Sequence, residues 1–391
     1  MMFARRWAQV WLAIGLLWFL VAIALAPSNK VYQQGLVAFV WLPTLLMLWS
    51  ARALVLEVWR AQRWLCLAIA LLFCWSALSL FWSNVEEEGR EIKRLVYIAV
   101  FLLFFPILAN TDCERVIRLL NWGGFGLAVA AVYSIVLFYV GQSQPWYARL
   151  YGVGEISHPI LGAYVIAAAI IWMLHWPPRN LWWQGGWGLA LIALGLFLVL
   201  CQSRSAALAL LISVVAMPIW CRDRRSYWLA GVALVTAMIG FVLLQSLIMS
   251  RGSSYRPEIL QVSVQMISEH PWTGLGLGSF YRINAAGLEF DHSHNMFTHI
   301  AIELGIPGML LWLTIWLCVL REIWKARDTT FGQGLMGLWL FSTLAMQFDA
   351  ASLTGTPRAE WFISWLPVGL ATVLVWVRAR APGCDKISGS I

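Results

Sequence analysis

The stretch Asp291–Val319 reads DHSHNMFTHIAIELGIPGMLLWLTIWLCV and changes character within a few positions. Its first five residues are polar, whereas residues 296–319 are mostly apolar and long enough to cross a hydrocarbon core of about 30 Å as a helix. Comparable apolar stretches recur along the chain of 391 residues, of which 61% are hydrophobic and 12% are charged. Backbone polar groups inside lipid must bond to one another, so such stretches are expected to form helices. The sequence therefore predicts an all-α polytopic membrane protein.

About twelve transmembrane helices follow from this pattern, with boundaries that are soft by a few residues. We predict spans at residues 7–26, 35–50, 64–82, 91–109, 121–140, 158–176, 184–201, 205–220, 227–248, 296–319, 332–349 and 360–378. Many of the 26 tryptophans fall near the ends of these spans, where tryptophan prefers the membrane interface. The plan has four parts: spans one to nine in residues 1–248, a large late loop in 249–295, spans ten to twelve in 296–380, and a tail in 381–391.

Orientation follows from the basic residues. Most of the 27 lysines and arginines lie in loops on the same side of the membrane as the N-terminus. Loops rich in these residues stay in the cytoplasm. Twelve spans return the C-terminus to that side, so both termini are expected to be cytoplasmic. Further apolar spans follow the first one, which favours an anchor over a cleaved signal peptide. The net charge of +8 comes largely from these loops and gives no reason to expect nucleic acid as a partner.

Basic residues on the outer side run against this bias and are therefore more informative. Arg204 lies in a minimal turn, QSRS at residues 202–205, between two apolar segments. A guanidinium offers a planar fork of donors that suits phosphate oxygens. The alternative is that Arg204 extends to phospholipid headgroups. The outer basic residues are Lys30, Arg90, Lys93, Arg94, Arg149, Arg204, Arg251, Arg256, Arg282 and Arg358.

The outer loop at residues 249–295 is the one long enough to fold. Apolar residues between Pro257 and His270 recur at helical spacing, which predicts a short amphipathic helix on the outer surface. Pro271 ends this helix, and the run GLGLG at residues 274–278 then permits a close approach of the backbone to another group. The run is a poor dinucleotide-binding fingerprint, because no strand precedes it and no helix begins there.

Three histidines lie close together at the junction of this loop with the next span: His292, His294 and His299. With Asp291 and Glu303 they could hold a metal ion. They could instead belong to the N-terminal cap of the following helix, or form a proton pathway in a transporter. The interpretation that we prefer makes one histidine a general base, because an imidazole titrates near neutral pH. We therefore predict neither a metal site nor a cofactor.

Glycosyl transfer from a lipid pyrophosphate is a reaction that would use both the histidine base and the outer arginines. The base would take the proton of an acceptor hydroxyl, and the arginines would stabilise charge on the leaving pyrophosphate. No ATP-binding loop is present in the sequence, and none is needed for a donor that is already activated. The acidic run at residues 86–88 is interpreted as a solvated face and not as a metal site. The seven cysteines contain no CxxC pair and are interpreted as buried or interface residues.

The pair His294–Asn295, followed after nine residues by Gly305 and Gly308, resembles the signature of the O-antigen ligase family. This family belongs to a superfamily with O-antigen polymerases and protein O-oligosaccharyltransferases. Further motifs extend the resemblance from Gln202 to Gly308. They are Ser203–Arg204 in the short outer loop, Arg256 near the start of the long loop, and His270–Pro271 followed by the glycine run and Phe280.

The resemblance implies a metal-independent, inverting glycosyltransferase of the GT-C type in the bacterial inner membrane, with its active site in the periplasm. It would transfer O-antigen from undecaprenyl pyrophosphate to a sugar hydroxyl of lipid A-core. The partners are then the lipid-linked O-antigen, the lipid A-core oligosaccharide and membrane lipids. A polymerase or a protein O-oligosaccharyltransferase of the same superfamily remains an alternative. A lipid-linked sugar flippase is an alternative of another class.

The resemblance also assigns roles to residues. It implies that His294 is the base and that Arg204 and Arg256 bind the donor diphosphate. Other outer basic residues are further candidates for diphosphate binding: Arg149, Lys93, Arg94 and Arg358. The supporting residues are His292, Asn295, Gly305 and Gly308.

Overall fold

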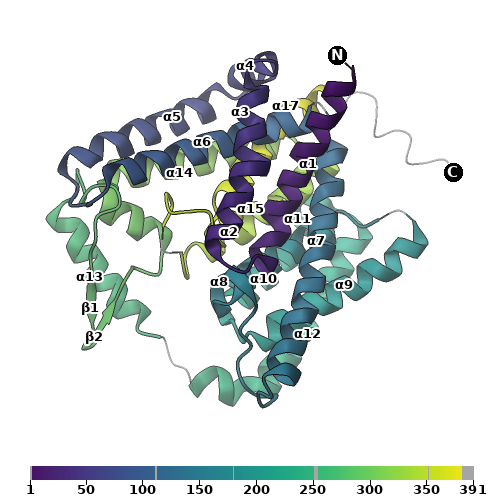
Figure 1. The fold of residues 1–391 in the computed structure, drawn as a ribbon. Coiled ribbons are helices and arrows are strands. Elements are labelled where there is room, and N and C mark those ends of the chain that lie inside the picture. The colour runs from purple at the N-terminus through teal and green to yellow at the C-terminus, as the bar shows by residue number, and fades with distance from the viewer. Residues whose placement is uncertain (1, 111, 179, 251–253, 351, 381–391) are drawn as a thin grey trace.

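The computed structural model describes residues 2–110, 112–178, 180–250, 254–350 and 352–380. Arg251 and the predicted tail at residues 381–391 lie outside the described residues. Helices make up most of the chain and form a bundle, from which α13 and a small hairpin project at one side (Figure 1).

A helix or a run of consecutive helices lies at each of the twelve predicted spans. Nine of the helical segments within the described residues are long and apolar enough to cross a membrane, and Pro159–His175 and Trp365–Ala379 are shorter apolar helices. The α-helices are α1 Met2–Leu25, α2 Asn29–Leu36, α3 Leu42–Leu48, α4 Arg52–Ala61, α5 Arg63–Leu78, α6 Glu88–Ala109, α7 Cys113–Val136, α8 Pro159–His175, α9 Leu181–Leu200, α10 Arg204–Ala216, α11 Pro218–Cys221, α12 Arg224–Ser250, α13 Arg256–Glu269, α14 Met296–Lys325, α15 Thr330–Ala345, α16 Glu360–Ile363 and α17 Trp365–Arg380.

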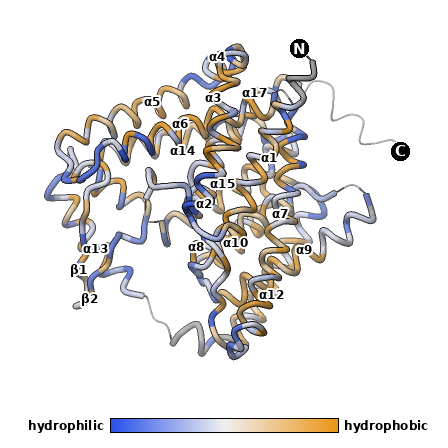
Figure 2. Tube along the Cα trace, viewed as in Figure 1, coloured by the Kyte–Doolittle hydropathy of each residue, from blue (hydrophilic) through white to orange (hydrophobic). Residues whose placement is uncertain are grey.

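The bundle has a buried centre and an apolar outside. α8 and α17 are buried along almost their whole length, as expected of helices that are apolar on all sides. α9 and α12 lie at the periphery and expose many large apolar side chains. Figure 2 shows the same pattern, with apolar residues along the helices of the bundle and polar residues around α13 and the hairpin. Exposed apolar surface on this scale fits a chain whose solvent is lipid.

The long loop folds as a small unit of its own. The predicted amphipathic helix is confirmed as α13. The all-α prediction did not include the antiparallel hairpin of β1 (Ile283–Ala285) and β2 (Leu288–Phe290). Its two turn residues, Ala286 and Gly287, both have positive φ, which suits a two-residue hairpin turn. A small apolar core joins this unit to α14: Ile259, Tyr281, Ile283, Ala285 and Ile302.

The glycine run packs against a kink in α14. Gly305 has φ 69° and ψ −178°, which interrupts the helix and leaves carbonyl groups of the preceding turn without helical partners. The backbone N–H of Leu275 donates to Ile302 O at 2.8 Å, and that of Gly276 donates to Glu303 O at 2.8 Å. A Cβ on Gly274 would lie 2.4 Å from Glu303 O. The close approach predicted for this run is thus made to the chain's own backbone, and it holds the loop on α14.

Candidate functional site

His294 and His292 meet on one carboxylate, that of Asp349. Nδ1 of His294 lies 3.0 Å from Oδ1 of Asp349, and Nε2 of His292 lies 3.2 Å from the same oxygen. Nδ1 of His292 lies 2.7 Å from Oδ1 of Asp291. Asp349 is only 3% exposed and follows the end of α15 at Ala345. The predicted span at residues 332–349 therefore ends earlier as a helix, and its last residues form the loop that carries this carboxylate.

The backbone conformation at His294 and Asn295 shows what each residue of the His–Asn pair does in the structure. His294 has φ 52°, in the left-handed region, so its side chain leaves the chain at a sharp turn. Asn295 then caps α14: its Oδ1 accepts hydrogen bonds from Phe297 N at 2.9 Å and Thr298 N at 3.2 Å. Its Nδ2 donates to Oε1 of Gln347 at 3.0 Å, two residues before Asp349. Asn295 thereby fixes the start of α14 and holds the histidine loop beside the carboxylate.

Charge at the cluster is unevenly distributed. Burial alone would raise the pKa of Asp349, but hydrogen bonds from His292 and His294 outweigh it and hold that pKa well below its ordinary value. Burial alone would lower the pKa of His292, but Asp349 and Asp291 outweigh it and raise that pKa. This shift favours the protonated form of His292 between the two carboxylates. An ionised Asp349 accepts Nδ1–H of His294, so that in the neutral imidazole Nε2 carries the lone pair. Nε2 of His294 has no hydrogen bond among the described residues.

Three of the predicted arginines line one cavity. Arg149, Arg204 and Arg256 surround a volume of about 100 Å³ together with the turn at residues 202–205 and Ser254. Nη2 of Arg204 donates to Ser254 Oγ at 3.2 Å. Nη1 of Arg256 is buried and has no hydrogen-bond partner among the described residues. A buried charged donor without a partner is costly, so this cavity is suited to bind an anion.

The arginine cavity adjoins the histidine cluster. The guanidinium of Arg256 lies 5.6 Å from the ring centroid of Phe348, the residue directly before Asp349. His158, which caps α8 two residues before the cavity residue Ile160, lies within the electrostatic reach of Arg149, Asp349 and the cluster histidines. The histidine cluster and a set of guanidinium groups are therefore neighbours.

Other predicted site residues lie elsewhere. Arg358 is 3.7 Å from Oε2 of Glu155. Lys93 is exposed on α6, and Arg94 forms an ion pair with Glu91 on the same helix. None of these three basic residues lines the arginine cavity. Gly305 forms the kink of α14, and Gly308 packs against the side chain of Leu304.

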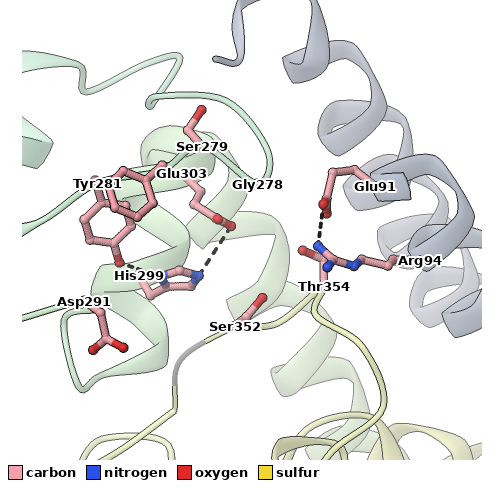
Figure 3. Close-up of a pocket in the computed structure, with 11 residues that line it drawn as sticks. Glu91, Arg94, Gly278, Ser279, Tyr281, Asp291, His299, Glu303, Ser352 and Thr354 are labelled. Carbon is pink, nitrogen blue, oxygen red and sulfur yellow. Dashed lines mark hydrogen bonds and ion pairs between the residues drawn. The ribbon is translucent and has the colours of Figure 1, made fainter. Parts of the chain in front are cut away.

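His299 belongs to a separate group. Its Nδ1 lies 2.5 Å from the hydroxyl of Tyr281, and its Nε2 lies 3.4 Å from Oε2 of Glu303, one turn further along α14. These residues form one wall of a cavity of about 230 Å³, and Glu91 and Arg94 of α6 form the facing wall (Figure 3). The three histidines of the sequence cluster thus serve two sites.

The geometry of the histidine cluster is compatible with the metal-site alternative. The ligand atoms of His292, His294 and Asp349 lie within 4.8 Å of one another, so these side chains could hold a metal ion. Both histidine nitrogens that face Asp349 also form hydrogen bonds with it. The three side chains are therefore compatible with both alternatives, a metal centre and a hydrogen-bonded histidine.

Comparison with known proteins identifies the family. Residues 189–313 match the sequence pattern of the O-antigen ligase family, and this range includes Arg204, Arg256 and His294. The chain is also 30% identical over 311 residues to an O-antigen ligase of Pseudomonas aeruginosa, and the match covers 78% of this chain and 75% of that protein. An alignment of this length and identity extends well beyond the motif residues. The chain belongs to the O-antigen ligase family.

Proposed function

We propose that this protein is an O-antigen ligase that transfers O-antigen from undecaprenyl pyrophosphate to a sugar hydroxyl of lipid A-core. The observation that carries the proposal is the His294–Asp349 pair beside a cavity lined by Arg149, Arg204 and Arg256. The similarity to a protein of Pseudomonas aeruginosa that is named an O-antigen ligase supports the ligase assignment. A base next to an anion site is what glycosyl transfer from a lipid diphosphate requires.

His294 acts as the base in this proposal. The acceptor oxygen attacks the anomeric carbon of the donor sugar and forms the new C–O bond, while its proton passes to Nε2 of His294. The bond from the anomeric carbon to the diphosphate oxygen breaks, and the undecaprenyl pyrophosphate leaves with the electron pair. Attack opposite the leaving group inverts the anomeric centre. Asp349 keeps Nδ1 of His294 protonated and stabilises the imidazolium that forms.

The arginines bind the diphosphate. Arg256 and Arg204 stabilise the negative charge that develops on the leaving group, and Arg149 completes the cavity wall. The ring of Phe348 lies beneath the guanidinium of Arg256 and links its position to that of Asp349. No metal ion or cofactor takes part in this proposal, because guanidinium groups supply the positive charge.

The proposed location is the bacterial inner membrane, with the site on the periplasmic side. The start of α14, the end of α15 and the start of α10 carry the site residues, so the site lies at one end of the bundle. The basic loops that the positive-inside rule assigns to the cytoplasm lie at the opposite helix ends, for example Arg222 before α12 and Lys325 at the end of α14.

A reconstitution tests the function. Purified protein in liposomes receives undecaprenyl-pyrophosphate-linked O-antigen and lipid A-core, and the product is identified by mass. Glycan attached to lipid A-core supports the ligase. A lengthened lipid-linked glycan would indicate a polymerase, and transport across the bilayer without a new covalent bond would indicate a flippase. Either of these results would replace the ligase assignment.

A further inference from the structure

The cavity that contains His299 has no role in the proposed chemistry, although its wall is strongly polar. Glu91 and His299 are 3% and 5% exposed, and each carries a polar atom without a hydrogen-bond partner among the described residues: Oε2 of Glu91 and Nε2 of His299. Nε2 of His299 lies 3.4 Å from Glu303 but lacks hydrogen-bond geometry. Buried polar atoms without partners are rare and call for an explanation, and a ligand rich in hydroxyl groups would satisfy them.

Figure 3 shows how the wall is built. Tyr281, His299 and Glu303 face Glu91 and Arg94 across the cavity, and Ser352 and Thr354 close it from the loop after Asp349. Carboxylates accept hydrogen bonds, guanidinium and serine hydroxyl groups donate them, and Phe280 adds an aromatic ring at the edge that is 69% exposed. This mixture of donors, acceptors and a ring suits an uncharged polyol better than an anion or an apolar ligand.

The size of the cavity fits a small group. Its volume of about 230 Å³ lies below the roughly 300–1,000 Å³ of sites for drug-sized ligands, which suits one sugar ring. A neighbouring cavity of about 480 Å³ shares Glu91, Gly278 and Phe280 with it and continues past Glu87 and Arg90. A short saccharide could therefore place one ring inside and its remaining rings in the outer cavity.

A chain of contacts places the histidine cluster between the two sites. On one side, Asp291 lines the His299 cavity and lies 2.7 Å from Nδ1 of His292. His292 and His294 then meet at Asp349. On the other side, Phe348 contacts Arg256, which lines the arginine cavity. Inverting nucleophilic displacement needs the acceptor and the leaving group on opposite sides of the anomeric carbon. The base must lie on the acceptor side.

We infer that the His299 cavity binds a sugar ring of the acceptor saccharide and presents its hydroxyl to His294. The inference rests on the proposed function, and it assigns Glu91, His299, Glu303 and Tyr281 to acceptor recognition. These residues select a hydroxyl pattern, since a site built for hydroxyl groups rejects a sugar that lacks one. The donor diphosphate stays in the arginine cavity and does not touch this wall.

Transfer kinetics with purified full-length protein test the inference. Ser352→Leu fills part of the cavity without removing an ion pair. Ser268→Leu, the same change at an exposed position of α13 that does not line this cavity, is the matched control. Glu91→Gln keeps the side-chain shape but removes a charged acceptor. For E91Q, the KM for lipid A-core should rise by roughly 5- to 150-fold, the range expected when one buried polar group loses its partner. S352L should raise the same KM, because leucine occupies space that the sugar ring needs. The KM for the lipid-linked donor should stay within about twofold of the wild-type value.

Binding is measured separately from transfer. The probe is the lipid-free core oligosaccharide of a strain without O-antigen, titrated into wild-type protein and into the Ser352→Leu and Ser268→Leu variants. Weaker binding to S352L alone supports the inference. An increase in the donor KM instead would assign the cavity to the donor glycan, and unchanged kinetics and binding would show that it takes no substrate; both results overturn the inference. Wild-type protein that binds the oligosaccharide but transfers nothing would contradict the proposed function and leave the binding site standing.

Discussion

Nδ1 of His294 lies 3.0 Å from Oδ1 of Asp349, although 55 positions separate the two residues in the chain. The carboxylate is buried at the end of α15, and the imidazole is partly exposed at the start of α14. This contact fixes which ring nitrogen of His294 holds the proton, as the base in the proposed function requires. The same carboxylate also holds His292, so a single buried charge organises both imidazoles.

The pair should act as one unit. We expect His294→Ala to lower kcat by roughly 10²–10⁴-fold, the usual contribution of a general base, and Asp349→Asn to lower it by a similar order. The double variant should lose little more than His294→Ala alone, because both changes remove the same function. Steady-state transfer rates measure this, and thermal unfolding in detergent checks the fold. Losses that multiply in the double variant would show that the two residues act independently.

Stability should depend on pH at the same cluster. The pKa of His292 is raised from 6.5, so its protonation stabilises the fold fully below about pH 6.5, and this contribution is lost as the pH rises through the raised pKa. The pKa of Asp349 is lowered from 3.8, so its contribution is present above that value and is lost as the pH falls further.

Unfolding temperatures measured across pH for wild type and His292→Gln test this dependence. We expect the difference between the two proteins to be largest below about pH 6.5, the ordinary pKa of histidine, and to shrink at higher pH. A difference that grows with rising pH would contradict the assignment of His292 as a cation between Asp291 and Asp349.

Donor binding should depend on the arginine cavity. Arg204→Ala and Arg256→Ala should each raise the KM for the lipid-linked donor by roughly tenfold or more, since hydrogen bonds to charged groups contribute about 1.5–3 kcal/mol. Arg256→Lys should retain donor binding only in part, because an ammonium group lacks the planar face with which the guanidinium lies over Phe348. Lys30→Ala, an exposed outer lysine, is the matched control. If both alanine variants kept the wild-type KM for the donor, the assignment of the diphosphate site to this cavity would be wrong.

The kink of α14 should be sensitive to a single methyl group. Gly305 has φ 69° and ψ −178°, a conformation nearly restricted to glycine, and a Cβ there would lie 2.6 Å from Trp272 O. Gly305→Ala should therefore destabilise the protein by about 1–3 kcal/mol or prevent insertion. Gly186→Ala on α9 meets no atom within 4 Å and should leave stability unchanged or slightly increased. Equal unfolding temperatures for both variants would refute the strain at Gly305.

Chelation separates the base from the metal alternative. His292, His294 and Asp349 could hold a metal ion by their geometry, but the proposed reaction uses the imidazole directly. Transfer by protein treated with excess EDTA should therefore equal transfer by untreated protein. Activity that is lost with EDTA and returns with one divalent ion would assign the cluster to metal binding.

The sequence by itself determined the apolar helices and α13, and it predicts which side of the membrane the basic loops occupy. These follow from hydropathy, helical spacing and charge, which are local properties of the chain. It also singled out His294, Arg204 and Arg256, since polar residues at the outer ends of apolar spans stand out. The hairpin was missed because its two strands of three residues are too short for a clear alternating pattern.

Only the tertiary structure decided which of these residues share a site. In the sequence, Asp349 is only the last residue of an apolar segment. In the structure, α15 ends at Ala345, and the loop that follows places Asp349 against His294. His299 lies five positions after His294, yet on α14 its ring contacts Tyr281, whereas the ring of His294 contacts Asp349. Such pairings depend on how separate helices end and pack against one another, and the order of residues along the chain does not contain that information.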